Sequence, residues 1–151
     1  MRPALVEMKP LKVFVFVSLA LPIAGCGYRT SEEVIASRQA AQQAYDKALQ
    51  GIASKDFASA KPLLDQAIDS RKLYVDVLAS AYVSRAICSA AAGDFKAAHA
   101  DLDEMEKGAP NLDEIFAARS FVLRKQGKTK AAKAAWARAR RMNRYVKKIT
   151  D

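Results

Sequence analysis

The sequence predicts an all-α protein of stacked helices, and three observations lead to this prediction. A set of residues recurs at an offset of 34 positions in the second half of the chain. Apolar residues after Thr30 recur at the spacing of a helix face. No segment after Thr30 alternates polar and apolar residues over a useful length, so the sequence does not support a sheet. We therefore expect six or seven helices.

Length and composition are consistent with one folded domain. The 151 residues are enough for a modest hydrophobic core, and 51% of them are apolar, which argues against a disordered chain. The net charge of +9 is unevenly distributed: residues 115–151 contain twelve Lys and Arg and one acid, whereas residues 26–114 contain ten bases and fourteen acids. The C-terminal part is therefore strongly basic and the part before it is mildly acidic.

The N-terminal residues have the features of an export signal. Lys9 and Lys12 precede an apolar stretch at 13–24, which ends in small residues. This stretch is shorter than the roughly 20 residues of a membrane-spanning helix, and Pro22 would disturb such a helix. We therefore predict that residues 1–25 are a signal peptide, with either Met1 or Met8 as its start.

The residues Ile23-Ala24-Gly25-Cys26 resemble the lipobox of bacterial lipoproteins, an aliphatic residue and two small residues before a cysteine. The resemblance implies that the thiol of Cys26 receives a diacylglycerol and that cleavage occurs before this residue. Two or three acyl chains anchor a protein stably, at ~0.8 kcal/mol per buried methylene. The alternative is a buried cysteine at the end of a core helix, which would not need the flanking lysines.

The lipoprotein resemblance also implies a location. An aspartate after the cysteine is associated with retention at the inner membrane, and this chain has Gly27 there. We expect a lipid-anchored protein of the bacterial cell envelope, at the outer membrane and facing the periplasm, with residues 26–30 as a linker. In a bacterium with one membrane, the same signal would anchor the chain on the outer face.

The first helix is predicted from residue 31 to about Ile52. Thr30 and Glu33 form a capping box. A stripe of apolar positions follows at helical spacing: Val34, Ala41, Ala44, Tyr45, Ala48 and Ile52. In the next helix, Pro62 should produce a kink or displace the helix start by a turn.

The repeat is clearest between the second and third copies. Pairs of residues 34 positions apart have matching character: Tyr82 and Phe116, Gly93 and Gly127, Ala98 and Ala132, Leu102 and Trp136, Met105 and Ala139. An earlier copy lies 38 residues before the second and contributes Phe57, Ala60, Leu64 and Ala67. Four extra residues therefore fall near 73–78.

These residues resemble the tetratricopeptide repeat, through the turn Gly93-Asp94-Phe95, the small Ala98, the large Leu102, the apolar Met105 and the helix-ending Pro110. The resemblance implies a right-handed superhelical stack of antiparallel helix pairs, an α-solenoid. Its three units would cover about 41–74, 79–112 and 113–146, within a helical domain of residues 31–151. The chain departs from the family pattern at four positions: Arg85 and Arg119 in place of leucine, Lys55 in place of the turn glycine, and Thr129 in place of an aromatic residue.

The residue types that carry catalysis are not patterned in this sequence. His99 is the single histidine, and no nucleophile or second ligand accompanies it. The acidic run at 101–114 places Glu106 where a calcium loop needs glycine and Leu112 where it needs glutamate, so we interpret its acids as helix-surface carboxylates. Cys88, in an alanine-rich run, is predicted to be a small buried hydrophobe. We expect no enzyme activity, no metal and no cofactor.

The tetratricopeptide resemblance implies that the first helix of each unit lines a concave groove, which would bind an amphipathic helix or an extended apolar segment of a protein partner. The residues expected there are Tyr45, Leu49, Ile52, Val83, Ile87, Phe121, Arg124 and Lys125. The family's clamp for a terminal carboxylate uses asparagine and lysine at positions where this chain has Tyr45, Leu49 and Val83, so a chaperone-tail adaptor is disfavoured. The alternative is that some of these residues pack between helices.

The basic C-terminal part is a second candidate surface. An apolar stripe is expected along a continuing last helix, with the rest of that helix basic: Ala132, Ala135, Trp136, Ala139, Met142, Val146 and Ile149. The basic face would attract anionic lipid head groups, cell-wall acids or an acidic partner, through Arg138, Arg140, Arg141, Arg144, Lys147 and Lys148. The alternative is a solvated capping face. An exported location disfavours nucleic acid, and self-association could cover the ends of the stack.

Overall fold

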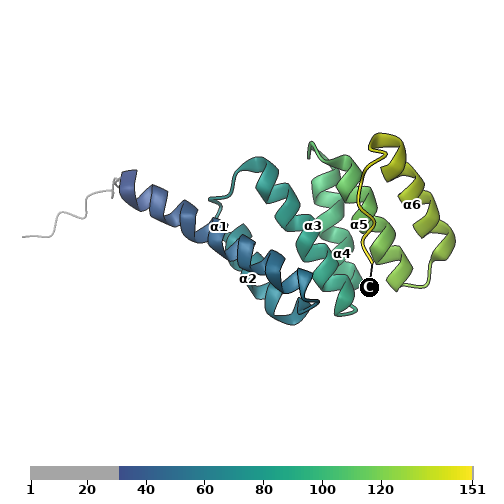
Figure 1. Cartoon of the computed structure of the whole chain (residues 1–151), viewed down its shortest axis with the longest axis horizontal. Helices are drawn as coiled ribbons and strands as arrows, with labels where there is room; N and C mark the ends of the chain where they lie inside the picture. Colours follow the sequence, from purple (N-terminus) through teal and green to yellow (C-terminus); the bar gives the residue numbers. More distant parts are fainter. Residues whose placement is uncertain (1–30, 151) are drawn as a thin grey trace, which may run out of the picture.

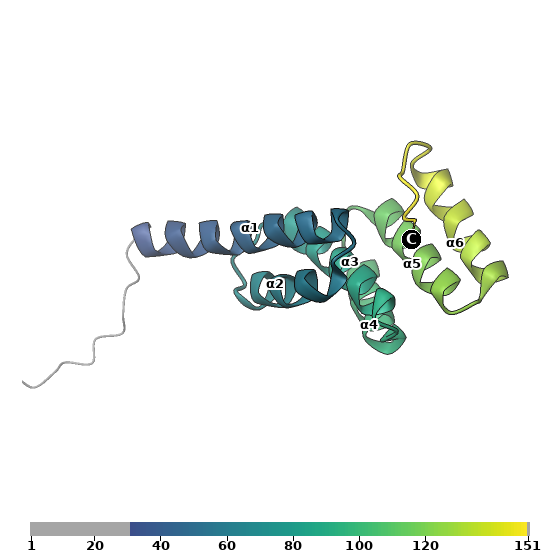
Figure 2. The ribbon, with the colours of Figure 1, turned by 60° about the horizontal axis from the view of Figure 1, so that its bottom comes forward.

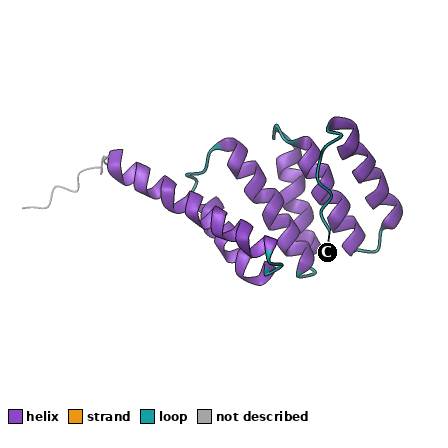
Figure 3. Ribbon diagram, in the orientation of Figure 1, coloured by secondary structure: helices purple, strands orange, loops and turns teal. Residues whose placement is uncertain are grey.

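The computed structural model describes residues 31–150, and these residues form six helices and no strand (Figures 1 and 3). The fold is therefore all-α, as predicted. The helices are α1 (Ser31–Ala53), α2 (Phe57–Asp69), α3 (Val75–Ala91), α4 (Phe95–Glu106), α5 (Leu112–Lys125) and α6 (Thr129–Met142).

Consecutive helices form three antiparallel pairs that follow one another along the longest axis of the molecule (Figure 1). The most extensive contacts are within the pairs, α1 with α2, α3 with α4 and α5 with α6. Between pairs, α2 packs on α3 and α4 packs on α5. The first helices of the pairs are also neighbours, because α3 contacts both α1 and α5. Figure 2 shows the same succession from a second direction.

The three turns inside the pairs have the same backbone geometry. Lys55, Gly93 and Gly127 have φ angles of +63°, +84° and +74°. In each turn the next amide donates to a carbonyl five residues earlier: Asp56 to Gly51 at 2.8 Å, Asp94 to Ser89 at 2.9 Å and Lys128 to Leu123 at 2.9 Å. This is the bond pattern of a helix that ends on a left-handed residue. The first pair therefore makes the glycine-type turn with a lysine.

The small residue of each copy lies where two helices meet. Ala60, Ala98 and Ala132 are all buried. A side-chain carbon added to Gly51 of α1 would lie 3.2 Å from Cβ of Ala60, which shows how closely α1 and α2 approach. The large residue that follows is fully buried as Leu64 and Leu102 and half-buried as Trp136. The repeated positions of the sequence are thus the positions that pack the pairs.

Three elements depart from a regular repeat. The start of α1 projects beyond the body of the molecule, because α1 has 23 residues and its partner α2 has 13 (Figure 1). Most of the four extra residues near 73–78 lengthen α3 at its start, since α3 begins at Val75 and α5 begins at Leu112. Pro62 lies within α2, which begins at Phe57, so of the two predicted effects, a kink or a displaced helix start, the displaced start does not occur.

The last helix is shorter than predicted. We expected Val146 and Ile149 on a continuing helix, but α6 ends at Met142, and Asn143 has extended backbone angles of −141° and +107°. The Asn143 side chain favours this break, because its Nδ2 donates to Asp113 Oδ2 at 2.8 Å and its Oδ1 accepts the Tyr145 amide at 2.9 Å. Residues 143–150, called the return segment below, then run back beside α5 (Figures 1 and 2).

Candidate functional site

On α1, the predicted groove residues form a partly open apolar surface. Leu49 is 39% exposed, and Tyr45 and Ile52 are half-buried against the core that α1 shares with α2 and α3. Burial raises the pKa of the Tyr45 hydroxyl, the Ser80 hydroxyl of α3 partly offsets this shift, and the charge of Glu114 adds to it. Tyr45 therefore lies against α3.

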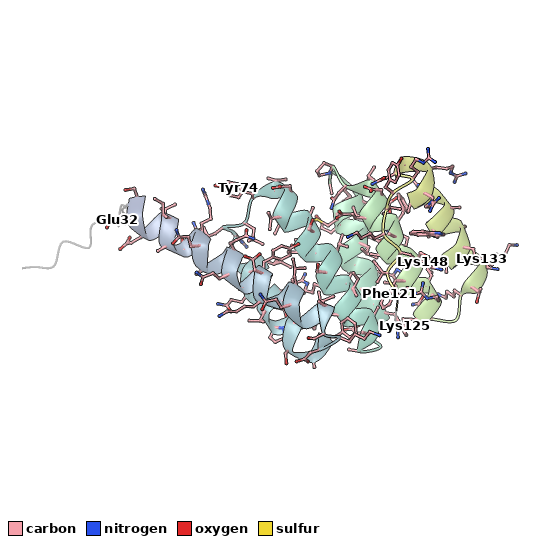
Figure 4. All side chains as sticks on the ribbon, in the orientation of Figure 1. Glu32, Tyr74, Phe121, Lys125, Lys133 and Lys148 are labelled. Carbon is pink, nitrogen blue, oxygen red and sulfur yellow. The ribbon has the colours of Figure 1, made fainter. Side chains whose placement is uncertain are left out.

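On α3 and α5, the predicted groove residues divide into buried and accessible side chains. Val83, Ile87 and Phe121 are 6%, 8% and 1% exposed and belong to one core cluster. These three side chains therefore pack between helices, which was the alternative to a place in the groove, and they present little surface to a partner. Arg124 and Lys125 lie at the end of α5, and their charged groups are 5.4 Å and 5.6 Å from the Phe121 ring centroid. Figure 4 labels Phe121 and Lys125.

The return segment contributes to this burial, because it lies along α5. At its start, Asn143 donates to Asp113 in the first turn of the helix. Near its end, the carbonyl oxygen of Ile149 accepts from Arg124 Nη2 at 2.8 Å, close to the end of α5. Ile149 packs against the cluster that contains Val83, Ile87 and Phe121. The segment therefore covers part of the face that the sequence assigns to a partner.

A cavity of about 420 Å³ remains between α3, α5 and the return segment. Val83 comes from α3, and Asp113, Glu114 and Ala117 come from α5. The return segment supplies the other wall through Asn143, Tyr145, Val146, Lys147 and Ile149. The cavity thus has an apolar floor and acidic groups at the start of α5.

The six residues of the predicted basic face are not on one helix. Arg138, Arg140 and Arg141 are on α6, whereas Arg144, Lys147 and Lys148 are on the return segment. All six side chains are exposed. Figure 4 labels Lys148 of the return segment and Lys133 of α6, which is not one of the six.

The charge of Arg138 is used within the chain. Its guanidinium lies 3.8 Å from the Phe116 ring centroid, and its Nη1 lies 3.8 Å from Glu106 Oε1. Contacts of this kind connect α6 to α4 and α5. The other five residues of the predicted basic face therefore carry most of its accessible charge.

Arg85 and Arg119 stand where the tetratricopeptide pattern prefers leucine, and their ion pairs between helices were not predicted from the sequence. Arg85 of α3 bonds Asp101 of α4 through two nitrogens, at 2.9 Å and 2.7 Å, and Asp65 of α2 at 3.0 Å. Asp101 is buried, so its interpretation as a surface carboxylate was wrong. The physical reason is that the paired guanidinium compensates the buried carboxylate.

Arg119, 34 positions after Arg85, makes the corresponding link from α5 to α4. Its Nη2 lies 2.8 Å from Asp103 Oδ1 and 2.7 Å from Glu106 Oε2. The acidic run thus supplies partners for arginines on two neighbouring helices. The 34-residue offset between the two arginines was the signal that could have revealed this role.

The described residues contain little that suggests catalysis. His99 is half-buried, and its Nε2 lies 3.2 Å from Gln126 Oε1. Burial raises the pKa of the Cys88 thiol to about 11, which keeps it protonated at neutral pH. Within residues 31–150, no group of three or more His, Cys, Asp and Glu side chains is placed to hold a metal ion.

The predicted lipid-anchor residue, Cys26, and the signal peptide lie outside the described residues. Among the helices in residues 31–150, none has the length and hydropathy needed to cross a bilayer. Comparison of the chain with protein families, curated proteins and solved structures gave no match in any of the three.

Proposed function

We propose that the chain is a lipid-anchored scaffold of the bacterial cell envelope, which binds a partner protein through the face formed by α1, α3 and α5 and performs no catalysis. Its anchor would be the acylated thiol of Cys26. Its three helix pairs would form a right-handed superhelical stack of the tetratricopeptide type.

The recurring turn supports the stack. The same backbone geometry at Lys55, Gly93 and Gly127 is accompanied by burial of the same small residue five positions later. Each pair has an apolar side that it cannot cover alone, so it packs on the next pair. Stacks of this kind leave the first helices side by side, and here α3 contacts both α1 and α5.

The observation that carries the proposed binding function is the occupied face. A stretch of polypeptide outside the helices, the return segment, already lies on the α3 and α5 part of this face, and its residues 146–149 follow α5 after an initial turn. The α1 part remains accessible through Leu49. A surface that holds one extended segment has the chemistry to hold another, because main-chain carbonyls and aliphatic side chains are common to many partners.

A photo-crosslinking amino acid at Leu49 tests the proposed function in intact cells of the source bacterium. We expect one dominant cross-linked protein in the envelope fraction, and we expect Leu49→Asp to prevent its co-purification, because the charge would stay exposed without disturbing the core. Gln66→Asp, on the exposed side of α2, is the matched control and should retain the partner. Loss of the partner with Gln66→Asp but not with Leu49→Asp would contradict the assigned face.

A second candidate function is binding of an anionic envelope polymer or lipid head groups through the basic surface. It is favoured by the exposed Lys133, Arg140 and Arg141 of α6, and residues 115–150 contain no acid. Such binding should weaken steeply as salt rises from 0.05 to 0.5 M, on the order of the tenfold or more that several screened contacts produce. Binding that is indifferent to salt would exclude this candidate.

A further inference from the structure

We propose that the face of α3 and α5 under the return segment is a binding site for an extended peptide with two aliphatic residues three positions apart and basic residues between them. The return segment, through Val146, Lys147, Lys148 and Ile149, is its resident occupant, and a partner must displace it. This inference rests on the proposed function, since it names the chemistry of the partner and the way in which access is regulated.

The geometry of the return segment is that of a bound peptide. It runs in the same direction as α5, from Asp113 to Arg124, a helix length of about 16 Å at 1.5 Å per residue. Residues 143–146 form a turn, in which the Val146 amide donates to the Asn143 carbonyl oxygen at 3.1 Å. Residues 146–149 then continue without a helix or a turn to the carbonyl oxygen that Arg124 binds, so the contacts of the segment follow the length of α5.

The contacts do not depend on the covalent connection to α6. Arg124 binds a main-chain carbonyl oxygen, that of Ile149, which any peptide offers. Val146 and Ile149 are half-buried against the cluster that contains Phe116 and Ala117, and Lys147 and Lys148 between them are exposed. A segment of another protein with aliphatic residues at these two positions would make the same contacts.

Charge selects a basic occupant. Asp113 and Glu114 stand in the first turn of α5 and line the cavity together with Lys147. The return segment contains three bases, Arg144, Lys147 and Lys148, and no acid. The acidic end of the site therefore complements a basic segment and disfavours an acidic one.

Most residues of the return segment are exposed, which favours its exchange for another peptide. Side-chain hydrogen bonds join its two ends to α5, from Asn143 to Asp113 and from Arg124 to the Ile149 carbonyl oxygen, and Tyr145 between them is 81% exposed. The cavity of about 420 Å³ beside it has room for a side chain that the segment does not supply. Because the segment is tethered, its effective concentration is on the order of millimolar, so a separate peptide must compete with it.

A labelled peptide of residues 143–150 provides the test. Its affinity is measured by fluorescence anisotropy for the full-length chain in detergent and for a Val146→Ser/Ile149→Ser variant, whose own segment has lost its apolar contacts. We expect the variant to bind the peptide at least about tenfold more tightly, because the competing occupant has been released. Lys148→Ser, which keeps both aliphatic residues, is the matched control and should bind as weakly as the unmodified chain.

Two further measurements examine specificity. A peptide with serine at both aliphatic positions should not bind, and Asp113→Lys in the released variant should weaken binding at least about tenfold. Equal affinity of the unmodified chain and the released variant would overturn the inference, as would equal binding of the serine peptide. Displacement of the segment by anionic phospholipid vesicles, without displacement by the peptide, would also overturn it and assign the segment to a membrane surface.

Folding of the released variant is checked separately. Its helical circular dichroism should equal that of the unmodified chain, and the fluorescence of Trp136, which packs in the cluster with Val146, should change. If the double variant loses helix, the single Ile149→Ser variant is used with hydrogen exchange. Excess peptide should then accelerate exchange of the amides at 143–150, and unchanged exchange would count against the inference.

The outcomes separate this inference from the proposed function. If the released variant binds the peptide but no envelope partner is cross-linked, the proposed function is contradicted and the peptide site is supported. A partner cross-linked at Leu49 whose binding is unaffected by release of the segment would contradict this inference alone.

Discussion

The guanidinium of Arg85 in α3 forms a two-bond pair with the carboxylate of Asp101 in α4, from Nε to Oδ2 at 2.9 Å and from Nη2 to Oδ1 at 2.7 Å. The remaining nitrogen, Nη1, donates to Asp65 of α2 at 3.0 Å. The hydrogen bond to Asp101 is the main reason that the pKa of Arg85 is raised above its ordinary value, so its charge is fixed. One side chain thus joins three helices from two successive pairs.

Removal of one member of this pair should be costly, and removal of both should not. Asp101→Leu or Arg85→Leu each leaves a poorly solvated charge, and we expect each to lower the free energy of unfolding by about 3 kcal/mol. The double variant Arg85→Leu/Asp101→Leu should lose much less than the sum, because neither member is left without the other and Asp65 keeps its pair with Lys61 at 3.0 Å. Urea unfolding followed by circular dichroism measures these losses. Strictly additive losses would show that the pair is not coupled.

The Lys107 and Glu104 pair provides the matched control for this measurement. Its atoms are 2.7 Å apart, but its side chains are 71% and 57% exposed. Solvent screens such a pair, so Lys107→Ala should leave the unfolding midpoint nearly unchanged.

The left-handed backbone at Lys55 should make glycine the better residue there. Lys55→Gly and Lys55→Ala both remove the lysine side chain, but only glycine adopts a φ of +63° without strain. We expect the glycine variant to unfold with a free energy about 1 kcal/mol higher than that of the alanine variant. Thermal unfolding distinguishes them.

The reverse change in the third turn gives an independent check. Gly127 has a φ of +74°, and a side-chain carbon there would meet nothing within 4 Å. Any loss of stability in Gly127→Ala therefore comes from the backbone, and we expect about 1 kcal/mol. An unchanged stability would mean that these turns do not require a left-handed residue.

The third pair lacks the helix cap that the first two have. Asp56 accepts the Ser59 amide at 3.1 Å and Asp94 accepts the Ala97 amide at 3.0 Å, whereas Lys128 makes no side-chain cap bond at the start of α6. Lys128→Asp should therefore raise the free energy of unfolding by about 1 kcal/mol. Chemical denaturation measures the gain.

Lys130→Asp is the control for this cap. It adds the same charge to the first turn of α6 but cannot cap the helix, so it should give only the smaller helix-dipole contribution. Equal gains from the two variants would attribute the effect to charge and not to the missing cap.

Low pH should weaken the N-terminal cap of α2, which is formed by Asp56. The bonds from Ser59 lower the pKa of Asp56 below its ordinary value of 3.8. A carboxyl group with a depressed pKa in the folded state contributes stability above its unfolded pKa and loses it as the pH falls through the folded pKa. The contribution should therefore be complete at pH 6, should begin to decline as the pH approaches 3.8, and should disappear only below the lower pKa of the folded state.

Melting temperatures of the unmodified chain and of Asp56→Asn, measured between pH 7 and pH 2, provide the test. The difference between the two should be constant near neutral pH and should shrink as Asp56 is protonated. A difference that grows toward low pH would reverse the assigned direction of the pKa shift.

The two cysteines should differ in chemistry. A fatty-acid label should enter the mature protein through Cys26 and be absent in Cys26→Ser, because the predicted anchor needs this thiol. In Cys88→Ser the label should be unchanged. Lipid incorporation that persists in Cys26→Ser would contradict the lipobox interpretation.

Maleimide should leave Cys88 unmodified in the folded chain at pH 7, because the pKa of its buried thiol is about 11.

The helices and their pairing could be predicted because they depend on local and repeated features. A left-handed turn residue, a small residue five positions later and a large residue after that are sufficient to define each pair, and these recur as Gly93, Ala98 and Leu102. Substitution of the turn residue by Lys55 did not hide the first pair, because its other positions kept their spacing.

The candidate site was predicted less well, because spacing does not distinguish a covered apolar side chain from an open one. Phe121 has the same place in the pattern whether a partner, solvent or the chain itself covers it. Val146 and Ile149 also continue the helical spacing of α6, so the pattern predicts a longer helix. The break depends on Asn143 and its bond to Asp113, 30 residues earlier, a contact that periodicity does not contain.

The projecting start of α1 has a mechanical consequence. About ten residues of this helix, or ~15 Å, extend past the end of α2. One contact connects this projecting part of α1 to the residues before α3. The Arg38 guanidinium lies 4.7 Å from the Tyr74 ring centroid and donates to the Tyr74 hydroxyl oxygen at 3.0 Å (Figure 4 labels Tyr74). A force applied through residues before Ser31 would therefore act at the end of a rigid helix, and the Arg38–Tyr74 contact would be one of the interactions that resist bending of this helix relative to the others.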